Sequence, residues 1–309
     1  DNIASVISVA TVSNVFSNAA QNFTLELTGA STNTTINVLN AAVAGNVTDV
    51  VNIKYNAATT GGNVAHTLHT IAAVETINVN STTSGTIAAG DINTLTTLTA
   101  SQLQTLNIVG DTKFVITNAI TTATIQTVDG SASTGGITYS GAASTQGLLI
   151  KGSAAAISGS VQDNDNILTG GAGLDVITGG TGIDTLVGGA GADTITGGGG
   201  VDTITGGLGN DVIVLTESTQ VSDSVVYEVR AEDAAVSNDA ITDFKVGATA
   251  DGSDQIDITL GTVGQFHDAA GVTDITLINI DDAGVNVVNI AEATKIATVT
   301  GAFDGADLT

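Results

Sequence analysis

The 309-residue chain contains no cysteine, proline, methionine or tryptophan. Without cysteine it can form no disulfide and perform no thiolate chemistry. No apolar run approaches the roughly 18 residues that a membrane-spanning helix needs, and the N-terminus lacks the pattern of a cleavable signal peptide. Because the chain begins at Asp1 and has no methionine, we expect it to be part of a longer polypeptide.

Positive charge is also scarce. Six lysines and arginines stand against 31 acids, which gives a formal net charge of −25. Residues 1–160 hold seven acids and three lysines, a net charge of −4, and residues 161–309 carry the remaining −21. Nucleic acids and anionic membranes attract basic surfaces, so this balance argues against both partners and favours cations. The sequence has neither a His-Glu-x-x-His nor a Gly-x-Ser-x-Gly motif, and we therefore expect no enzymatic activity in this chain.

What the sequence does contain is a strict nonapeptide repeat. Residues 170–214 read GGAGLDVIT, GGTGIDTLV, GGAGADTIT, GGGGVDTIT and GGLGNDVIV. Glycine stands at the first, second and fourth places, aspartate at the sixth, and an aliphatic residue at the eighth. A flexible glycine-rich linker would not keep an aliphatic residue in register over five units, so the repeat indicates an ordered structure.

The composition of each unit suits a hard cation. Glycine adopts conformations that let backbone carbonyls converge on one point, and aspartate adds the anionic oxygen that calcium prefers. The last three residues of a unit predict a very short strand, whose alternation points the aliphatic residue inward. Nine residues then form half a coil, and eighteen return the chain to its starting edge.

This pattern resembles the RTX calcium-binding repeat, in which nonapeptides form a parallel β-roll. The resemblance implies that each ion lies between loops 18 residues apart, bound by carbonyls of places two and four of one loop, carbonyls of places one and three of the other, and both aspartates. It places Asp175, Asp193 and Asp211 along one edge and pairs Asp184 with Asp202 along the other. The implied loop glycines are Gly170, Gly171, Gly173, Gly179, Gly180, Gly182, Gly188, Gly189, Gly191, Gly197, Gly198, Gly200, Gly206, Gly207 and Gly209.

The segment before the repeats, residues 161–169, fits the same frame without its glycines. Asn166 stands at the aspartate place and Leu168 at the aliphatic place. We interpret this segment as a degenerate entry coil in which Asn166 supplies part of a metal site. The frame also sets the predicted domains: a Thr/Asn-rich β region over 1–160, the calcium β-roll over 161–215, and a capping and export region over 216–309.

The N-terminal region is rich in β-branched residues bounded by glycine, asparagine and serine, which favours strands. The segments VETINV and LQTLNI share one template, and such runs recur about every 20 residues, roughly one coil of a solenoid. We favour a parallel β-solenoid, and a β-sandwich is the alternative. Strands are predicted over residues 23–27, 35–39, 50–55, 74–79, 103–108, 114–117 and 124–128.

Two stretches carry a helical pattern instead. The apolar spacing of residues 63–73 predicts a helix, and residues 95–104 fit a second helix less clearly. His66 and His69 would share a face of the first helix at a spacing that metal ligands use. No third ligand lies near them in the sequence, so we expect both to be surface residues.

Strands are predicted after the repeats as well, over residues 225–229, 275–278 and 285–290. They would close the end of the roll, where an open coil would expose unpaired backbone groups. Residues that match the segment following the repeats in many RTX proteins are Ile241, Asp243, Phe244, Gly247, Asp254, Ile256 and Asp257. The resemblance further implies type I secretion from a Gram-negative bacterium, directed by an uncleaved C-terminal signal that we place in residues 302–309.

Three functions fit this sequence. The long Thr/Asn-rich region ahead of the repeats resembles the calcium-dependent surface-layer proteins of Gram-negative bacteria, and we favour this class. It implies an extracellular structural protein that forms a two-dimensional lattice of identical copies, with contacts to surface glycan or lipopolysaccharide through parts outside this chain. The alternatives are the C-terminal folding and export module of a secreted protease or lipase, and the distal part of a large adhesin. In each case, repulsion between stacked aspartates predicts a roll that folds only with calcium.

Overall fold

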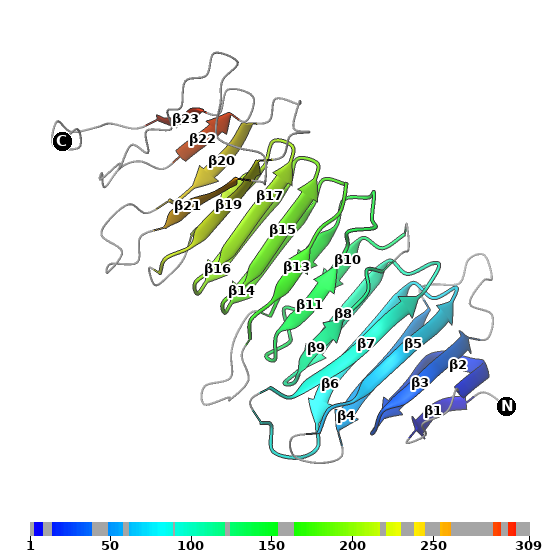
Figure 1. Cartoon of the computed structure of the whole chain (residues 1–309). Helices are drawn as coiled ribbons and strands as arrows, with labels where there is room; N and C mark the ends of the chain where they lie inside the picture. Colours follow the sequence, from blue (N-terminus) through cyan, green and yellow to red (C-terminus); the bar gives the residue numbers. More distant parts are fainter. Residues whose placement is uncertain are drawn as a thin grey trace.

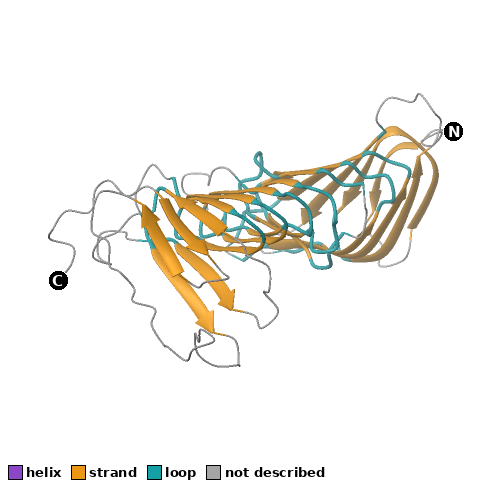
Figure 2. Ribbon diagram, turned by 90° about the horizontal axis from the view of Figure 1, so that it is seen from above, coloured by secondary structure: helices purple, strands orange, loops and turns teal. Residues whose placement is uncertain are grey.

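The computed structural model describes residues 3–8, 14–38, 49–57, 62–88, 90–120, 124–153, 164–216, 221–229, 238–244, 254–260, 287–291 and 296–300. Within these ranges the chain is all-β, with 23 strands and no helix. The strands follow one another along a single axis, in sequence order from blue to red (Figure 1). Seen from above, the described strands and loops make an elongated body (Figure 2). The predicted all-β solenoid is therefore confirmed, and the sandwich is not formed.

Successive strands alternate between two parallel sheets of ten strands each. The strands of the first sheet are β2 (Asn14–Leu27), β4 (Val50–Ala57), β6 (Thr76–Thr83), β8 (Thr105–Gly110), β10 (Thr127–Asp129), β12 (Leu149–Lys151), β14 (Val176–Thr181), β16 (Thr194–Gly199), β18 (Val212–Val214) and β20 (Asn238–Thr242). Those of the second are β3 (Ser31–Val38), β5 (Ala65–Ala72), β7 (Ile92–Thr99), β9 (Lys113–Ile116), β11 (Ile137–Ser140), β13 (Ile167–Thr169), β15 (Thr185–Ala190), β17 (Thr203–Leu208), β19 (Ser224–Val229) and β21 (Gln255–Leu260).

The two ends of the stack differ from its middle. At the N-terminal end, β1 (Ile3–Ser8) pairs with β2, whose first half pairs with β3 and whose second half pairs with β4. At the other end, β22 (Val287–Ala291) joins β20 and β23 (Ile296–Thr300) in antiparallel pairs. The antiparallel strands close the first sheet, as expected for a C-terminal β cap. The expected strand at 275–278, Gly247 and the signal placed in 302–309 lie outside the described residues.

One column of inward apolar residues runs through all ten strands of the first sheet. The register of each strand pair places one of them directly on the next, one coil away, and none is exposed. Burial of each such side chain contributes roughly 1.5–3 kcal/mol, so the column stabilises the stack along the whole length of the first sheet. Its members are Phe23, Val51, Ile77, Leu106, Val128, Ile150, Ile177, Ile195, Ile213 and Ile241.

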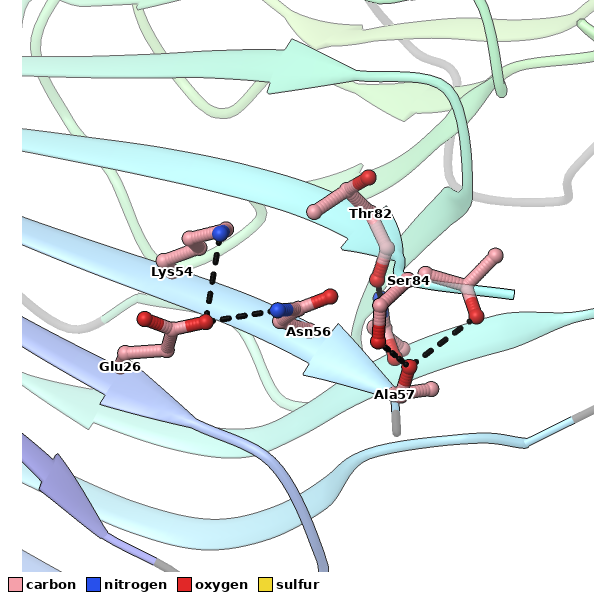
Figure 3. Close-up of polar contacts among 8 residues, drawn as sticks. Glu26, Lys54, Asn56, Ala57, Thr82 and Ser84 are labelled. Carbon is pink, nitrogen blue, oxygen red and sulfur yellow. Dashed lines mark hydrogen bonds and ion pairs between the residues drawn. The ribbon is translucent and has the colours of Figure 1, made fainter. Parts of the chain in front are cut away.

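The outward face of the N-terminal coils carries polar ladders between strands. The asparagines of the VETINV and LQTLNI segments stack in register: Asn107 Nδ2 donates to Asn78 Oδ1, and Asn78 Nδ2 donates to Asn52 Oδ1, both at 2.8 Å. On the same sheet, Lys54 and Glu26 form an ion pair (Figure 3), in which Lys54 Nζ lies 3.2 Å from Glu26 Oε1. Neighbouring coils here are therefore joined by neutral amides and paired charges.

The predicted helices over residues 63–73 and 95–104 are wrong. The first stretch forms β5, and the second forms the end of β7 followed by a turn. In β5 the alternation slips, because neither of the two residues between the buried His66 and His69 is itself buried. Inward positions there lie three apart, so an irregular alternation in a strand produces the spacing that otherwise indicates a helix.

The two histidines are not surface residues either. His66 is 1% exposed and His69 0%, and their rings stack with centroids 4.0 Å apart. His69 Nε2 lies 2.8 Å from the Tyr55 hydroxyl, and His66 Nε2 donates to the Leu68 carbonyl at 2.9 Å. Burial lowers the pKa of His66 and takes that of His69 well below its ordinary value, which keeps both rings neutral.

The strands of the repeats are longer than expected. The sequence predicts three residues per strand, but β14 to β17 each contain six and extend through the two glycines that open the next unit. Pairing such as Ile177 with Ile195 and Leu186 with Ile204 confirms the 18-residue coil. The aliphatic residues at the eighth place are all fully buried, as predicted: Ile177, Leu186, Ile195, Ile204 and Ile213.

Candidate calcium-binding site

The repeat aspartates stand at the corners of the roll, just before each strand begins. The two strand sheets place Asp175, Asp193 and Asp211 in one column, and Asp184 and Asp202 in the other. Each is at most 1% exposed. An aspartate is almost never fully buried without a partner, so the two columns are the part of the described chain that most needs a compensating group.

One carboxylate oxygen of each aspartate has a structural role. Asp175 N–H donates to Asp193 Oδ1 at 2.8 Å, across 18 residues, and Asp184 N–H donates in the same way to Asp202 Oδ1 at 2.9 Å. Asp193 N–H donates to Asp211 Oδ1 at 2.8 Å. Through these bonds each aspartate satisfies a backbone donor of the coil before it, so Oδ1 holds the coils in register.

The other oxygen, Oδ2, points into the glycine loop. A Cβ on Gly179 would collide with Asp184 Oδ2 and with the carbonyl of Gly197, and a Cβ on Gly188 would collide with Asp193 Oδ2. Among the described residues, no hydrogen-bond donor reaches Oδ2 of Asp184 or of Asp193. Each loop thus brings a buried anionic oxygen and backbone carbonyl oxygens to one place, and that is the ligand type that calcium takes.

Glycines at the second and fourth places are required by the backbone. At the second place from the second unit onward, and at the fourth place from the third unit onward, they adopt φ between about 108° and 135°, where L-residues with a side chain are strained. Their carbonyls also approach closely: a Cβ on Gly189 would collide with the Gly171 carbonyl one coil away. The glycines with positive φ are Gly180, Gly189, Gly198 and Gly207 at the second place, and Gly191, Gly200 and Gly209 at the fourth.

The electrostatics of the columns favour a bound cation. Burial, together with the like charges of Asp211 and Asp175, raises the pKa of Asp193 to about 7, against a hydrogen bond from the Asp175 N–H that lowers it. Burial also raises the pKa of Asp184 to about 6, against hydrogen bonds from Asn166 that lower it. A divalent cation between the coils would remove this penalty, because it replaces lost hydration and neighbouring repulsion with coordination.

The residues present therefore fit calcium, with the backbone as an essential donor. In the part of the chain that the structure describes, no group of three or more His, Cys, Asp or Glu side chains could hold a metal. A cation in the columns has to draw on glycine carbonyls in addition to aspartates. The exact carbonyls at places one to four remain those that the family resemblance implies. The His66–His69 pair belongs to no such metal group.

The structure adds three aspartates that the repeat pattern missed. Asp202 N–H donates to Asp223 Oδ1, Asp211 N–H to Asp239 Oδ1, and Asp223 N–H to Asp254 Oδ1, at 2.9 to 3.1 Å. The coils that bring them into the columns contain 21, 28 and 31 residues, so no nonapeptide period reveals them. A weaker signal exists: each stands two residues before an aliphatic residue, as the repeat aspartates do. Of the three, only Asp254 has a further signal in the sequence, as part of the segment that resembles the one following the repeats in RTX proteins.

A stack of parallel coils with buried carboxylates and glycine loops at its corners defines a calcium β-roll. Residues 162–182 and 178–213 match the family model of the RTX calcium-binding nonapeptide repeat (4 copies). The chain therefore carries RTX repeats, which occur typically in secreted, calcium-binding proteins. Comparison with curated proteins finds no match for the chain.

The described residues contain no helix with the length and apolar character needed to cross a bilayer.

Proposed function

We propose that this chain is a calcium-stabilised structural protein of the Gram-negative cell surface, and that it assembles with its own copies as part of a surface layer. The observation that carries the proposal is the unbroken apolar column from Phe23 to Ile241. Through it, the N-terminal coils and the calcium roll form one extended scaffold. A scaffold of this kind suits a load-bearing or lattice-forming protein.

Outward apolar residues on the roll support contacts between copies. Leu174 is 67% exposed, Ile183 60% and Val201 45%. All three stand at the fifth place of their units, on the outer side of the glycine loops. Ile183 and Val201 follow one another along one edge of the roll, beside Asp184 and Asp202, whereas Leu174 lies on the opposite edge beside Asp175. Exposed apolar side chains that recur on one rigid surface, as Ile183 and Val201 do, mark interaction sites more often than isolated ones do. Contacts that repeat without closing into a ring produce open arrays.

The expected calcium requirement of the roll supports an extracellular location. Extracellular calcium modules bind at roughly 10⁻⁴ to 10⁻³ M, far above cytosolic calcium. In this proposal the roll stays unfolded inside the cell, passes through a type I secretion channel, and folds in the medium. The carboxylate columns support this order of events because they are costly to bury before the ion is present.

The decisive test is electron microscopy of the purified chain with millimolar calcium and with chelator. We expect two-dimensional sheets only with calcium, and Ile183→Glu should weaken them without unfolding the roll, since Ile183 is largely exposed. Ala132→Glu introduces the same charge at an exposed residue outside the repeats and is the matched control. A chain that folds with calcium yet remains monomeric at high concentration refutes the lattice. It would favour the export and folding module of a larger secreted enzyme or adhesin.

A further inference from the structure

Besides lacking the loop glycines, the entry coil of the roll carries a side-chain amide, that of Asn166, where the later coils carry a carboxylate. Asn166 occupies the corner position directly above Asp184 and, like it, is 0% exposed. Its Oδ1 accepts the N–H of Ile137 at 3.0 Å and that of Ser153 at 3.1 Å. This oxygen therefore does what Oδ1 of each repeat aspartate does, since it satisfies a backbone donor of the preceding coil.

The Nδ2 group of Asn166 lies where an aspartate would place its second oxygen. In the regular coils a Cβ on the first glycine, such as Gly179, would collide with the aspartate Oδ2. In the entry coil the corresponding glycine is Gly152, which is aligned with Gly179 by the pairing of β12 with β14. A Cβ on Gly152 would lie 2.8 Å from Asn166 Nδ2. The amide nitrogen thus replaces the oxygen that faces the glycine loop.

The NH₂ group of Asn166 lies among oxygen atoms of the chemical types that coordinate calcium in proteins. Nδ2 donates to Asp184 Oδ1 at 2.9 Å, to the Asn164 carbonyl at 3.0 Å and to the Gly179 carbonyl at 3.2 Å. It also lies 3.4 Å from the Ser153 hydroxyl. One carboxylate, two carbonyls and a hydroxyl would be ordinary calcium ligands, and here they receive hydrogen bonds instead.

The orientation of the amide follows from its neighbours. If its oxygen and nitrogen were exchanged, the NH₂ group would face the N–H donors of Ile137 and Ser153, and no hydrogen bond could form there. The oxygen would at the same time face the Asp184 carboxylate and two carbonyls. Only the observed orientation pairs every donor with an acceptor, so the contrast with aspartate does not depend on an arbitrary assignment.

We propose that Asn166 ends the calcium column on this edge, because its amide takes the place of a cation between the entry coil and the first repeat. It is then a structural substitute for an ion, whereas the sequence had indicated a metal ligand. The first carboxylate with an oxygen left for an ion is Asp184, whose buried Oδ2 receives no hydrogen bond in the described chain. The junction between the N-terminal coils and the roll is consequently held without metal. It offers the next coil a preformed surface on which to bind its first ion.

The experiment is a count of bound calcium by equilibrium dialysis for the wild type, Asn166→Asp and Asn166→Ala. Asn166→Asp restores the second carboxylate oxygen and removes the NH₂ group, so it should bind one more ion per chain. Asn166→Ala should leave the count unchanged, although it removes buried hydrogen bonds and lowers stability. Asn78→Asp makes the same chemical change in the outward ladder of the N-terminal coils and should add no buried site. A loss of one ion in Asn166→Ala, or no gain in Asn166→Asp, overturns the proposal.

Hydrogen exchange gives a second readout that does not depend on Asn166→Ala remaining folded. In chelator, wild-type β13 should keep its protection while β15 and β17 lose theirs. In Asn166→Asp, β13 should lose its protection in chelator and regain it with calcium, because a buried carboxylate then replaces the amide. A wild type in which β13 depends on calcium as strongly as β15 contradicts a metal-free junction.

Discussion

The N-terminal coils and the calcium roll are built on the same stack but are stabilised differently. Strands β4 to β7 contain eight residues each, and the core of the N-terminal coils includes the buried aromatic residues Phe23, Tyr55 and Phe114. The roll has strands of three to six residues and buries one eighth-place aliphatic residue per half-coil. Apolar burial can support the first region by itself, whereas the second has too little of it to do so.

The corners show the same contrast in a single hydrogen bond. Val64 N–H donates to Asn93 Oδ1 at 2.8 Å, and Asp184 N–H donates to Asp202 Oδ1 at 2.9 Å, each one coil apart on the same edge. The geometry is shared and only the charge differs. An amide at the corner can be stacked without a counterion, and a carboxylate cannot be buried cheaply without one. The same stacked architecture can therefore fold without calcium where its corners carry amides, and it requires calcium where they carry carboxylates.

Removal of calcium should separate the two regions most clearly. In chelator we expect residues 170–214 to lose nearly all protection against hydrogen exchange, while β4 to β9 keep theirs. Exchange measured by mass spectrometry, with magnesium in place of calcium as a control, tests this. Equal protection of the roll with and without calcium would show that the ion is not needed for folding.

Asp193→Ala should produce the next largest effect. Asp193 lies in the middle of its column, with Asp175 and Asp211 on either side, and its loss disturbs the ions on both faces. Removing one partner of a buried charged interaction costs about 3 kcal/mol, so the calcium midpoint should rise steeply. Circular dichroism during a calcium titration measures the midpoint. Asn107→Ala, outside the roll, should leave it unchanged.

The two regions should respond to pH in opposite directions when calcium is absent. Burial depresses the pKa of His66 and His69 below the ordinary 6.5, so N-terminal stability is present above pH 6.5 and declines as pH falls below it. Burial raises the pKa of Asp184 to about 6 and of Asp193 to about 7. Their protonated forms favour the folded roll, so this contribution is present at acid pH and is lost as pH rises through 6 to 7.

Hydrogen exchange in chelator at pH 5 and pH 8, corrected for intrinsic rates, checks both directions. His66→Leu should reduce the acid sensitivity of the N-terminal coils, because the next coil already carries a leucine, Leu95, at the paired position. Destabilisation of both regions by the same pH change would contradict the assignment of opposite charge effects.

The smallest effect is expected at the surface pair in Figure 3. Lys54 and Glu26 are partly exposed, with side chains 37% and 23% accessible, and such pairs contribute about 0.2–1 kcal/mol. Lys54→Ala should lower the unfolding free energy by no more than this, and added salt should reduce the difference. Urea denaturation at two salt concentrations is the measurement. A loss above about 2 kcal/mol would mean that the pair is more than a surface contact.

Prediction from the sequence succeeded where the pattern was periodic. The aspartates at the corners and the aliphatic residues pointing inward were identified from the nonapeptide frame, and the asparagine template indicated strands that do stack in register. It failed at residues 63–73, where an irregular strand gave inward positions three apart. The buried histidines could not be predicted, because a polar residue in an otherwise apolar column is visible only once the column itself is known.

The sequence by itself determined the 18-residue coil, the place of each buried aliphatic residue within it, and the charge at each corner of the repeats. These properties are local, since they depend on residues at most one coil apart. Tertiary structure alone decided which residues meet across coils of unequal length, and so brought Asp223, Asp239 and Asp254 into the carboxylate columns. The physical reason is that a loop of any length can leave the stack and return to the same corner at a small entropic cost. Where coils differ in length, the number of residues between two positions no longer tells which residues lie one above the other in adjacent coils.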